Sequence, residues 1–225
     1  MSEPRLTRLS DRVQSWLRRW GAQPPSNVPL AEGRFVVVDV ETTGLQVRQD
    51  SLLSIGAVVI DRLCVDFRQQ FERTLRADTE RALDNILIHG LTPSEIRRAD
   101  DPATVLAEFV EFAGDSPLIA FAAAFDREVL RRACRRHLGA VLPNEFIDIA
   151  EIAPVLLPER RPRENTLDAW LRVLELETGP RHNAAADALA TAKLTLIVLH
   201  AALRQGIRDT AGLRHKVAVE RRRLC

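Results

Sequence analysis

The sequence has few residues that could build disulfides or structural metal sites, and no long apolar run. Its three cysteines, Cys64, Cys134 and Cys225, lie far apart without a C-x-x-C pair, which argues against a zinc or redox motif and favours reduced, structural thiols. No apolar run approaches the roughly 20 residues of a membrane span, and the N-terminus lacks the apolar core of a secretory signal. We therefore expect a cytoplasmic protein with no membrane span.

Charge is nearly balanced overall but unevenly distributed. The 225 residues carry a net charge of +1, with 46% hydrophobic and 28% charged residues, which is ordinary for a globular protein with one core. Residues 1–34 sum to +3 and residues 204–225 to +5, whereas 35–203 carry 19 basic and 26 acidic residues, or −7. The acidic middle suits a cation site, and the basic ends suit either a polyanion or plain solvation.

The chain divides into three parts. Apolar residues recur at helical spacing over 4–20 and include Trp16 and Trp20, and the Pro-rich stretch that follows cannot continue this helix. We assign 1–33 to an amphipathic helix and linker, 34–204 to the main domain and 205–225 to a basic tail. The N-terminal helix could dock on the domain, pair with a partner or contact nucleic acid or a membrane surface, and docking is the commoner fate.

Strand and helix patterns alternate along the main domain. Predicted strands cover 35–40, 52–60, 63–73, 118–121 and 146–148. Predicted helices cover 103–113, 126–137, 166–176 and 184–204. Three hairpin-linked strands followed by alternating helices and strands indicate an α/β fold, a mixed five-stranded sheet flanked by helices.

Two acids end the first strand. Asp39 and Glu41 follow the apolar run Phe35-Val36-Val37-Val38, and residues two apart on a strand share one face. Two neighbouring carboxylates repel each other, and a hard cation such as Mg²⁺ or Mn²⁺ is the usual means of keeping both ionised. A second Asp-x-Glu at Asp78 follows no apolar strand and is interpreted as a surface helix start.

Further acids and histidines fall at turns or helix starts. Asp126 opens a helix after a short strand, where it serves either a site at the sheet edge or simple capping. His182 and Asp187 are five apart, about 140° off a shared helical face. They converge more easily if His182 lies in the loop that Gly179-Pro180 indicates. Asp148 and Asp168 are interpreted as structural.

Four segments together resemble the motifs of the DEDD exonucleases, in the branch that includes the proofreading subunit of bacterial replicative DNA polymerase. In family order they are Asp39-Val40-Glu41-Thr42-Thr43-Gly44-Leu45, Ile88-His89-Gly90-Leu91-Thr92, Ala124-Phe125-Asp126 and His182-Asn183-Ala184-Ala185-Ala186-Asp187. The resemblance covers about residues 35–203. It implies a ribonuclease H-like fold and a metal-dependent 3′–5′ exonuclease that releases nucleoside 5′-monophosphates from single-stranded or frayed ends, with DNA favoured.

The resemblance also assigns roles. Asp39, Glu41 and Asp187 would hold one divalent cation, with Asp39 bridging to a second that Asp126 supports. His182 would take the proton from the attacking water. A further set would contact the terminal nucleotide: Thr42, Thr43, Gly44, Leu45 and His89.

One departure and two alternatives remain. Many relatives carry His-Asn where this chain has Phe121-Ala122, which bears on substrate alignment. A stand-alone enzyme is favoured over a proofreader bound to DNA polymerase subunits, because only about 20 residues follow the last predicted helix and Arg221-Arg222-Arg223 suits phosphate. A non-catalytic module that binds nucleic-acid ends or a partner is the alternative from another class. The sequence does not indicate an oligomeric state.

Overall fold

A computed structural model describes residues 27–44, 46, 49–77, 90–177, 179 and 183–224. The helix predicted over 4–20 and the first part of its linker lie outside these residues. So do three of the predicted site residues: Leu45, His89 and His182.

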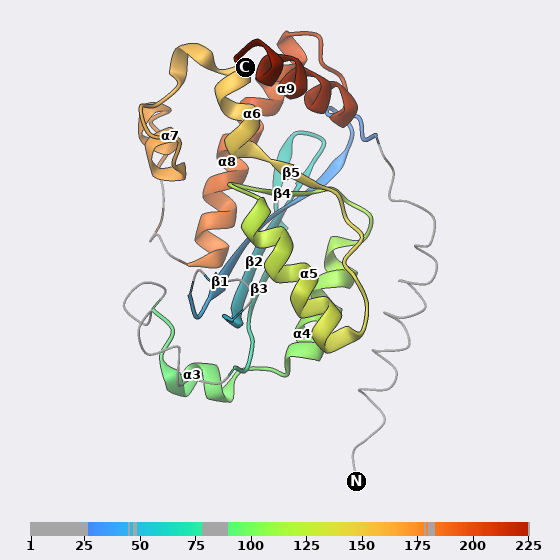
Figure 1. Cartoon of the computed structure of the whole chain (residues 1–225), viewed down its shortest axis with the longest axis vertical. Coiled ribbons are helices and arrows are strands. Elements are labelled where there is room, and N and C mark those ends of the chain that lie inside the picture. Colours follow the sequence, from blue (N-terminus) through green and yellow to red (C-terminus); the bar gives the residue numbers. More distant parts are fainter. Residues whose placement is uncertain are drawn as a thin grey trace.

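A mixed five-stranded sheet forms the centre of the molecule, as predicted (Figure 1). The strands are β1 (Arg34–Thr42), β2 (Leu52–Asp61), β3 (Cys64–Thr74), β4 (Leu118–Ala120) and β5 (Phe146–Asp148), in the order β3-β2-β1-β4-β5. The first three pair antiparallel, whereas β1–β4 and β4–β5 are parallel. Arg62 and Leu63 both have positive φ in the β2–β3 turn, as the type I′ hairpin geometry requires.

Helices cover both faces of the sheet (Figure 1). They are α3 (Pro93–Arg98), α4 (Pro102–Ala113), α5 (Ala124–Leu138), α6 (Ile149–Leu156), α7 (Leu167–Val173), α8 (Ala184–Arg204) and α9 (Thr210–Leu224), with a short 3₁₀ turn at Pro158–Arg160. The α4 and α5 helices pack on one face with Val36, Val38 and Val40 of β1. The α6, α7 and α8 helices pack on the other face with Phe35 and Val37. The alternation of β1 therefore divides the core into an α4/α5 layer and an α6–α8 layer.

The α8 helix lies directly against β1 and β2. Among the described residues it is the one helix long and apolar enough to cross a membrane, although the sequence analysis expects no such stretch. In the fold, 61% of that stretch is buried inside the protein. This burial is typical of the core helix of a soluble protein.

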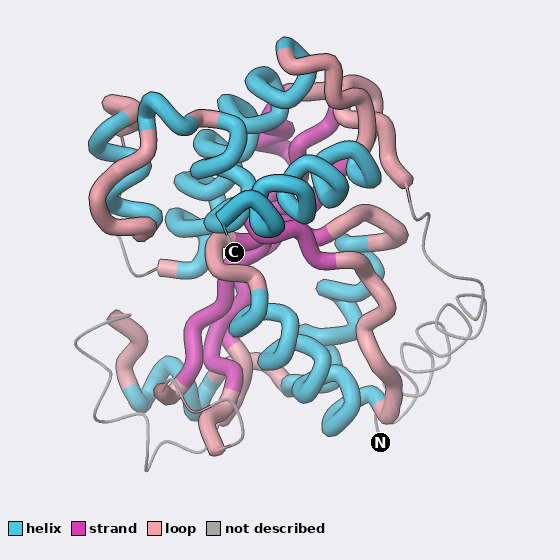
Figure 2. Tube along the Cα trace, turned by 45° about the horizontal axis from the view of Figure 1, so that its top comes forward, coloured by secondary structure: helices cyan, strands magenta, loops and turns pink. Residues whose placement is uncertain are grey.

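The last 15 residues before Cys225 form a docked helix. In Figure 2, α9 crosses in front of the strands, and it packs against α6. Its arginines form ion pairs with acids of the main domain, Arg214 with Glu145 and Arg221 with Glu151. The α9 charge is thus partly neutralised within the fold.

The two ends of the described chain are tied together. Leu30 N donates to Arg208 O at 2.8 Å, and Thr210 N donates to Val28 O at 3.0 Å. Val28 N also donates to the Thr210 hydroxyl, and Leu30 is fully buried. We name these contacts the clasp, formed by residues 28–30 and 208–210.

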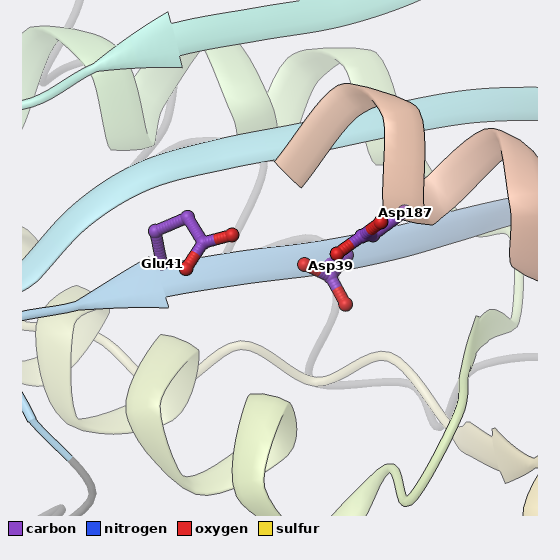
Figure 3. Close-up of side chains that lie close together, drawn as sticks. All are labelled: Asp39, Glu41 and Asp187. Atoms are coloured by element: carbon purple, nitrogen blue, oxygen red, sulfur yellow. The ribbon is translucent and has the colours of Figure 1, made fainter. Parts of the chain in front are cut away.

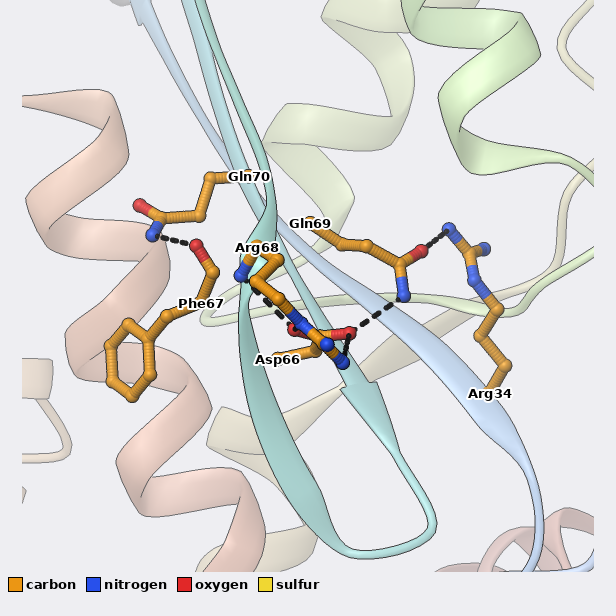
Figure 4. A network of polar contacts seen from close by, with 6 residues as sticks. All are labelled: Arg34, Asp66, Phe67, Arg68, Gln69 and Gln70. Atoms are coloured by element: carbon orange, nitrogen blue, oxygen red, sulfur yellow. Dashed lines mark hydrogen bonds and ion pairs between the residues drawn. The ribbon is translucent and has the colours of Figure 1, made fainter.

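A polar network braces the irregular part of β3 (Figure 4). The β2–β3 register shifts between Val58 and Val59, so that residues 67–69 have no partner in the ladder. Hydrogen bonds from the Arg68 side chain hold the pKa of Asp66 well below its usual range. Gln69 links Asp66 to Arg34, which donates to Phe112 O and Ala113 O and so joins the start of β1 to the end of α4.

Candidate active site

Three carboxylates from two elements meet at the end of β1 (Figure 3). Asp39, Glu41 and Asp187 each offer an oxygen, and these oxygens all lie within 4.8 Å of one another. Asp39 and Glu41 point to the α6–α8 layer, because they continue the face that carries Phe35 and Val37. The structure therefore brings together three of the four acids that the sequence analysis selected.

The first turn of α8 carries Asp187. Asn183 caps this helix, and its side-chain oxygen accepts a hydrogen bond from Ala186 N at 3.0 Å. Asp187 is 7% exposed, and its carboxylate benefits from the partial positive charge of the helix N-terminus. The cap and the helix dipole favour a negative charge at this position.

Gly56 allows α8 to approach the sheet closely. It is the β2 partner of Asp39 in the antiparallel ladder. A Cβ atom at this position would lie 2.1 Å from both Ala184 C and Ala185 N, which is far inside van der Waals contact. The absence of a side chain at Gly56 thus sets the separation between Asp39 and the helix that carries Asp187. Gly56 is not among the site residues predicted from the sequence, although a glycine in a predicted strand indicates close backbone approach.

Asp126 reaches the site from the opposite layer. It lies in the first turn of α5, is 5% exposed and stands outside the three-carboxylate cluster. Burial raises the pKa of Asp126 to about 7, the charges of Asp148 and Glu41 add to the rise, and hydrogen bonds with the backbone of Asp126 and Val40 oppose it. In the metal-free protein, Asp126 is therefore much harder to ionise than an ordinary carboxyl.

Asp148 holds the turn that leads into α5. Its carboxylate accepts hydrogen bonds from Ala122 N and Ala123 N, both at 3.0 Å, and it also caps α6 through Ala150 N. Ala122 has a φ of 57°, a left-handed conformation that Asn or Gly adopts with less strain. The departure from the family pattern at Phe121-Ala122 thus falls on a strained turn directly before α5.

Asp50 organises the turn that follows β1. Thr43 donates its hydroxyl proton to Asp50 Oδ1 at 3.0 Å, and Gln46 N donates to Asp50 Oδ2 at 2.7 Å. A Cβ atom on Gly44 would lie 2.6 Å from Asp50 Oδ2. Gly44 therefore makes room for this carboxylate, and Asp50 is a second positioning residue that the sequence analysis did not select.

The carboxylate cluster suits a hard cation. Oxygen atoms that share one Mg²⁺ or Mn²⁺ ion lie no more than about 4 Å apart, since each is about 2 Å from the metal. The Asp39, Glu41 and Asp187 oxygens, all within 4.8 Å of one another, lie close to this limit, so a small movement of the side chains would complete the site. Carboxylates this close are mutually destabilising without a compensating positive charge.

The mixed sheet, its two helical layers and the carboxylates at the end of its central strand define an exonuclease domain of ribonuclease H-like fold. The family model RNase_T, described as "Exonuclease", matches residues 36–195. The chain therefore belongs to the RNase_T exonuclease family, which confirms the resemblance found in its motifs.

Relatives of similar sequence agree with this family. The chain is 35% identical over 167 residues to "DNA polymerase III PolC-type" of Oceanobacillus iheyensis, which spans 73% of this chain and 11% of the polymerase. The corresponding Bacillus subtilis protein is 32% identical over 180 residues, or 79% of this chain and 12% of the polymerase. The chain thus spans about a tenth of the length of these relatives.

Two solved structures share the fold. One is E. coli Exonuclease I in complex with a dT13 oligonucleotide, with a TM-score of 0.65 and 20% identity over 77% of this chain and 42% of that one. The other is the zinc-bound form of the complex of E. coli Exonuclease I with single-stranded DNA, with a TM-score of 0.63 and 20% identity over 74% of this chain and 40% of that one. At this identity they bear on the fold alone, and they match its ribonuclease H-like architecture.

Proposed function

We propose that the protein is a metal-dependent 3′–5′ exonuclease that releases nucleoside 5′-monophosphates from single-stranded or frayed ends, with DNA as the favoured substrate. The observation that carries this proposal is the group of three carboxylate oxygens within 4.8 Å at the end of β1. Family membership supports nuclease chemistry at this position.

Mg²⁺ or Mn²⁺ is the proposed cofactor. Asp39, Glu41 and Asp187 would hold one ion, and Asp126 would support a second from the α5 side, with Asp39 between the two. When bound, the ions lower the pKa of water and offset negative charge on the departing 3′ oxygen. All donors in this set are carboxylate oxygens, which hard divalent cations prefer.

The remaining roles belong to side chains around this cluster. We assign His182 as the group that accepts a proton from the attacking water, a task suited to imidazole near neutral pH. Thr43 and Gly44 lie in the turn held by Asp50, and Thr42 ends β1 directly before it. We assign these three residues, with Leu45 and His89, to contacts with the terminal nucleotide. Such contacts select an end without reading sequence.

DNA is favoured over RNA because the relatives are named as DNA polymerases and Exonuclease I is seen with DNA oligonucleotides. We favour a stand-alone enzyme. The similarity to PolC-type polymerases supports a second candidate, a proofreading activity that works with DNA polymerase subunits. The free thiols of Cys64 and Cys134 fit a cytoplasmic location, and burial raises the pKa of Cys134 to about 12, which keeps it protonated.

A direct assay tests the proposal. The purified chain is incubated with Mn²⁺ or Mg²⁺ and with single-stranded DNA, mismatched duplex or short RNA carrying a 5′ label. Stepwise shortening from the unlabelled 3′ end, with mononucleotide products, is the expected result.

Two variants and one control complete the test. Asp39→Asn and His182→Ala should each abolish product release. Asp78→Asn, which alters the other Asp-x-Glu of the sequence, should leave it unchanged. Equal activity of Asp39→Asn and the natural chain would contradict the proposal. Failure to cleave any of the three substrates would favour a non-catalytic binding module, and stoichiometric capture of polymerase subunits would favour the proofreader.

A further inference from the structure

The α5 helix carries a row of arginines that leads away from the candidate site. Arg127, Arg131 and Arg135 recur every four residues, so they follow one side of the helix. Arg127 and Arg135 are exposed and Arg131 is half-buried. We name these three residues the arginine row.

The row lacks the acidic partners that other arginines of this chain possess. Surface arginines on other elements form ion pairs, such as Arg73 with Glu108 and Arg76 with Asp101. Within the part of the chain that the structure describes, no residue of the arginine row forms an ion pair. Like charges four residues apart on a helix repel each other and destabilise it.

Arg131, in the middle of the row, also has more positive than negative charge around its side chain. Its Nε atom is buried and has no hydrogen-bond partner among the described residues. Burial lowers the pKa of Arg131, and the charges of Arg127 and Arg135 lower it further, while Glu128 is the nearby charge that opposes them. An anion placed along the row would offset the mutual repulsion of the three guanidinium groups.

The position of the row relates it to the site. Arg127 directly follows Asp126, whose carboxyl feels the charge of Glu41. With a rise of about 1.5 Å per residue, the row extends about 12 Å along the helix from Arg127 to Arg135. Phosphates spaced about 3.4 Å apart in a stacked strand would place three to four nucleotides along this length.

We propose that the arginine row binds the phosphate backbone of a single strand on the 5′ side of the 3′ end held at the carboxylate cluster. This inference rests on the proposed function, since it concerns the same substrate beyond its terminal nucleotide. A polyanion fits the row better than an acidic protein surface does, because the row begins one residue after Asp126, which the proposed function places at an end-binding site for nucleic acid. The contacts are to phosphate and therefore read no sequence.

The main test replaces the two exposed members and uses the full chain throughout. Arg127→Ala/Arg135→Ala keeps α5 helical, since Ala has high helix propensity, and leaves half-buried Arg131 in place. The matched control, Arg160→Ala/Arg161→Ala, removes the same charge from exposed positions at the 3₁₀ turn that follows α6. KM and kcat are measured on DNA oligonucleotides of two to ten nucleotides, and binding of a fluorescent ten-nucleotide strand is measured with EDTA across a salt series.

For the natural chain, KM should fall as the oligonucleotide grows from two to about five nucleotides and then level off. The Arg127→Ala/Arg135→Ala variant should bind the ten-nucleotide strand about tenfold more weakly at low salt. Its slope of log affinity against log salt should decrease by about 1.4, or about 0.7 for each lost phosphate contact. Its kcat and KM on the dinucleotide should equal those of the natural chain, and the control should match the natural chain on every substrate.

The outcomes separate the two proposals. If the natural chain cleaves no oligonucleotide, the proposed function fails. If it cleaves normally and the double variant keeps the same salt slope and the same length dependence of KM, only the arginine row is wrongly assigned. An equal loss in the Arg160→Ala/Arg161→Ala control would also overturn the assignment, since the net charge of the protein rather than the arginine row would then attract the strand.

Discussion

The two helical layers contribute to the candidate site in different ways. The α6–α8 layer presents Asp187 to Asp39 and Glu41 at metal-binding separation, through a helix that rests on the bare backbone of Gly56. The α4/α5 layer contributes Asp126, which is buried outside that cluster, has a raised pKa and follows a turn strained at Ala122. The α6–α8 layer therefore determines where the cluster forms. The α4/α5 layer places beside it a carboxyl that is costly to ionise and a strained backbone turn.

The largest expected effect comes from removing the α8 carboxylate. Asp187→Asn should lower kcat by about 10³-fold or more, because loss of one ligand forfeits several kcal/mol of metal-dependent stabilisation. The effect is measured by mononucleotide release during a Mn²⁺ titration. Asp168→Asn, an exposed acid of the same layer outside the cluster, is the control. Activity of Asp187→Asn within tenfold of the natural chain would refute the assigned role of this layer.

The next effect tests the close approach of α8. Gly56→Ala should push the helix away from the sheet and lower kcat about 100-fold, since a shift near 1 Å at a reacting centre costs about this much. Apparent affinity for Mn²⁺ should fall with it. Leu106→Ala, a buried change in the α4/α5 layer expected to cost about 2–5 kcal/mol, is the control for lost stability and should keep its metal affinity. Equal metal affinity in Gly56→Ala and the natural chain would rule out this positioning role.

A third test concerns the ionisation of Asp126 in the α4/α5 layer. The pKa of Asp126 near 7 in the folded chain lies above the ordinary value of about 3.9. The folded chain favours the protonated carboxyl. This preference stabilises the fold fully below about pH 4, and the stabilisation is lost as pH rises from about 4 to about 7. Asp126→Asn cannot ionise, so in metal-free buffer its gain in stability should grow across this window to roughly 1–3 kcal/mol and then level off.

Thermal unfolding at pH 5 and pH 8 measures this difference. Asp115→Asn, an exposed acid, is the reference for losing one negative charge. A gain for Asp126→Asn that is the same at both pH values would show that its ionisation carries no such cost.

The smallest expected effect lies in the turn before α5. Ala122→Gly should relieve the left-handed backbone and stabilise the fold by about 0.5–1 kcal/mol, after the extra freedom of glycine in the unfolded chain is taken into account. Ala123→Gly is the matched control and should destabilise, because Ala123 has ordinary helical dihedrals. Chemical denaturation measures both changes, and a loss of stability in Ala122→Gly would show that the turn is not strained.

Much of the fold follows from local patterns in the sequence. The predicted β2 and β3 agree with the structure to within one residue at each end, and α8 is predicted at its observed bounds. The alternation of β1 correctly places Asp39 and Glu41 on one face. The α6 helix was missed because it is short and contains Pro154, and α9 was treated as a tail because its arginines mask the apolar contacts of Leu213 and Val217.

Other features depend on contacts between distant segments. The need for glycine at position 56 arises only when α8 packs on β2; a glycine in a predicted strand indicates a close approach, but the local sequence does not indicate which segment approaches. The burial of Asp126 requires both layers to be assembled around Val40. The carboxylates of Asp50 and Asp148 accept hydrogen bonds from backbone groups of other segments. Sequence patterns predict the ends of strands and helices better than they predict such hydrogen-bond partners.

The clasp changes how the boundaries of the domain are drawn. Leu30, Leu213 and Val217 all belong to the core of the α6–α8 layer, so a fragment limited to 34–204 would lose both halves of the clasp and expose the apolar surface that these side chains cover. We expect a fragment from Asn27 through α9 to be more stable than one limited to 34–204. Because β1 starts beside the clasp and ends at Thr42, the clasp lies about one strand length from the carboxylates.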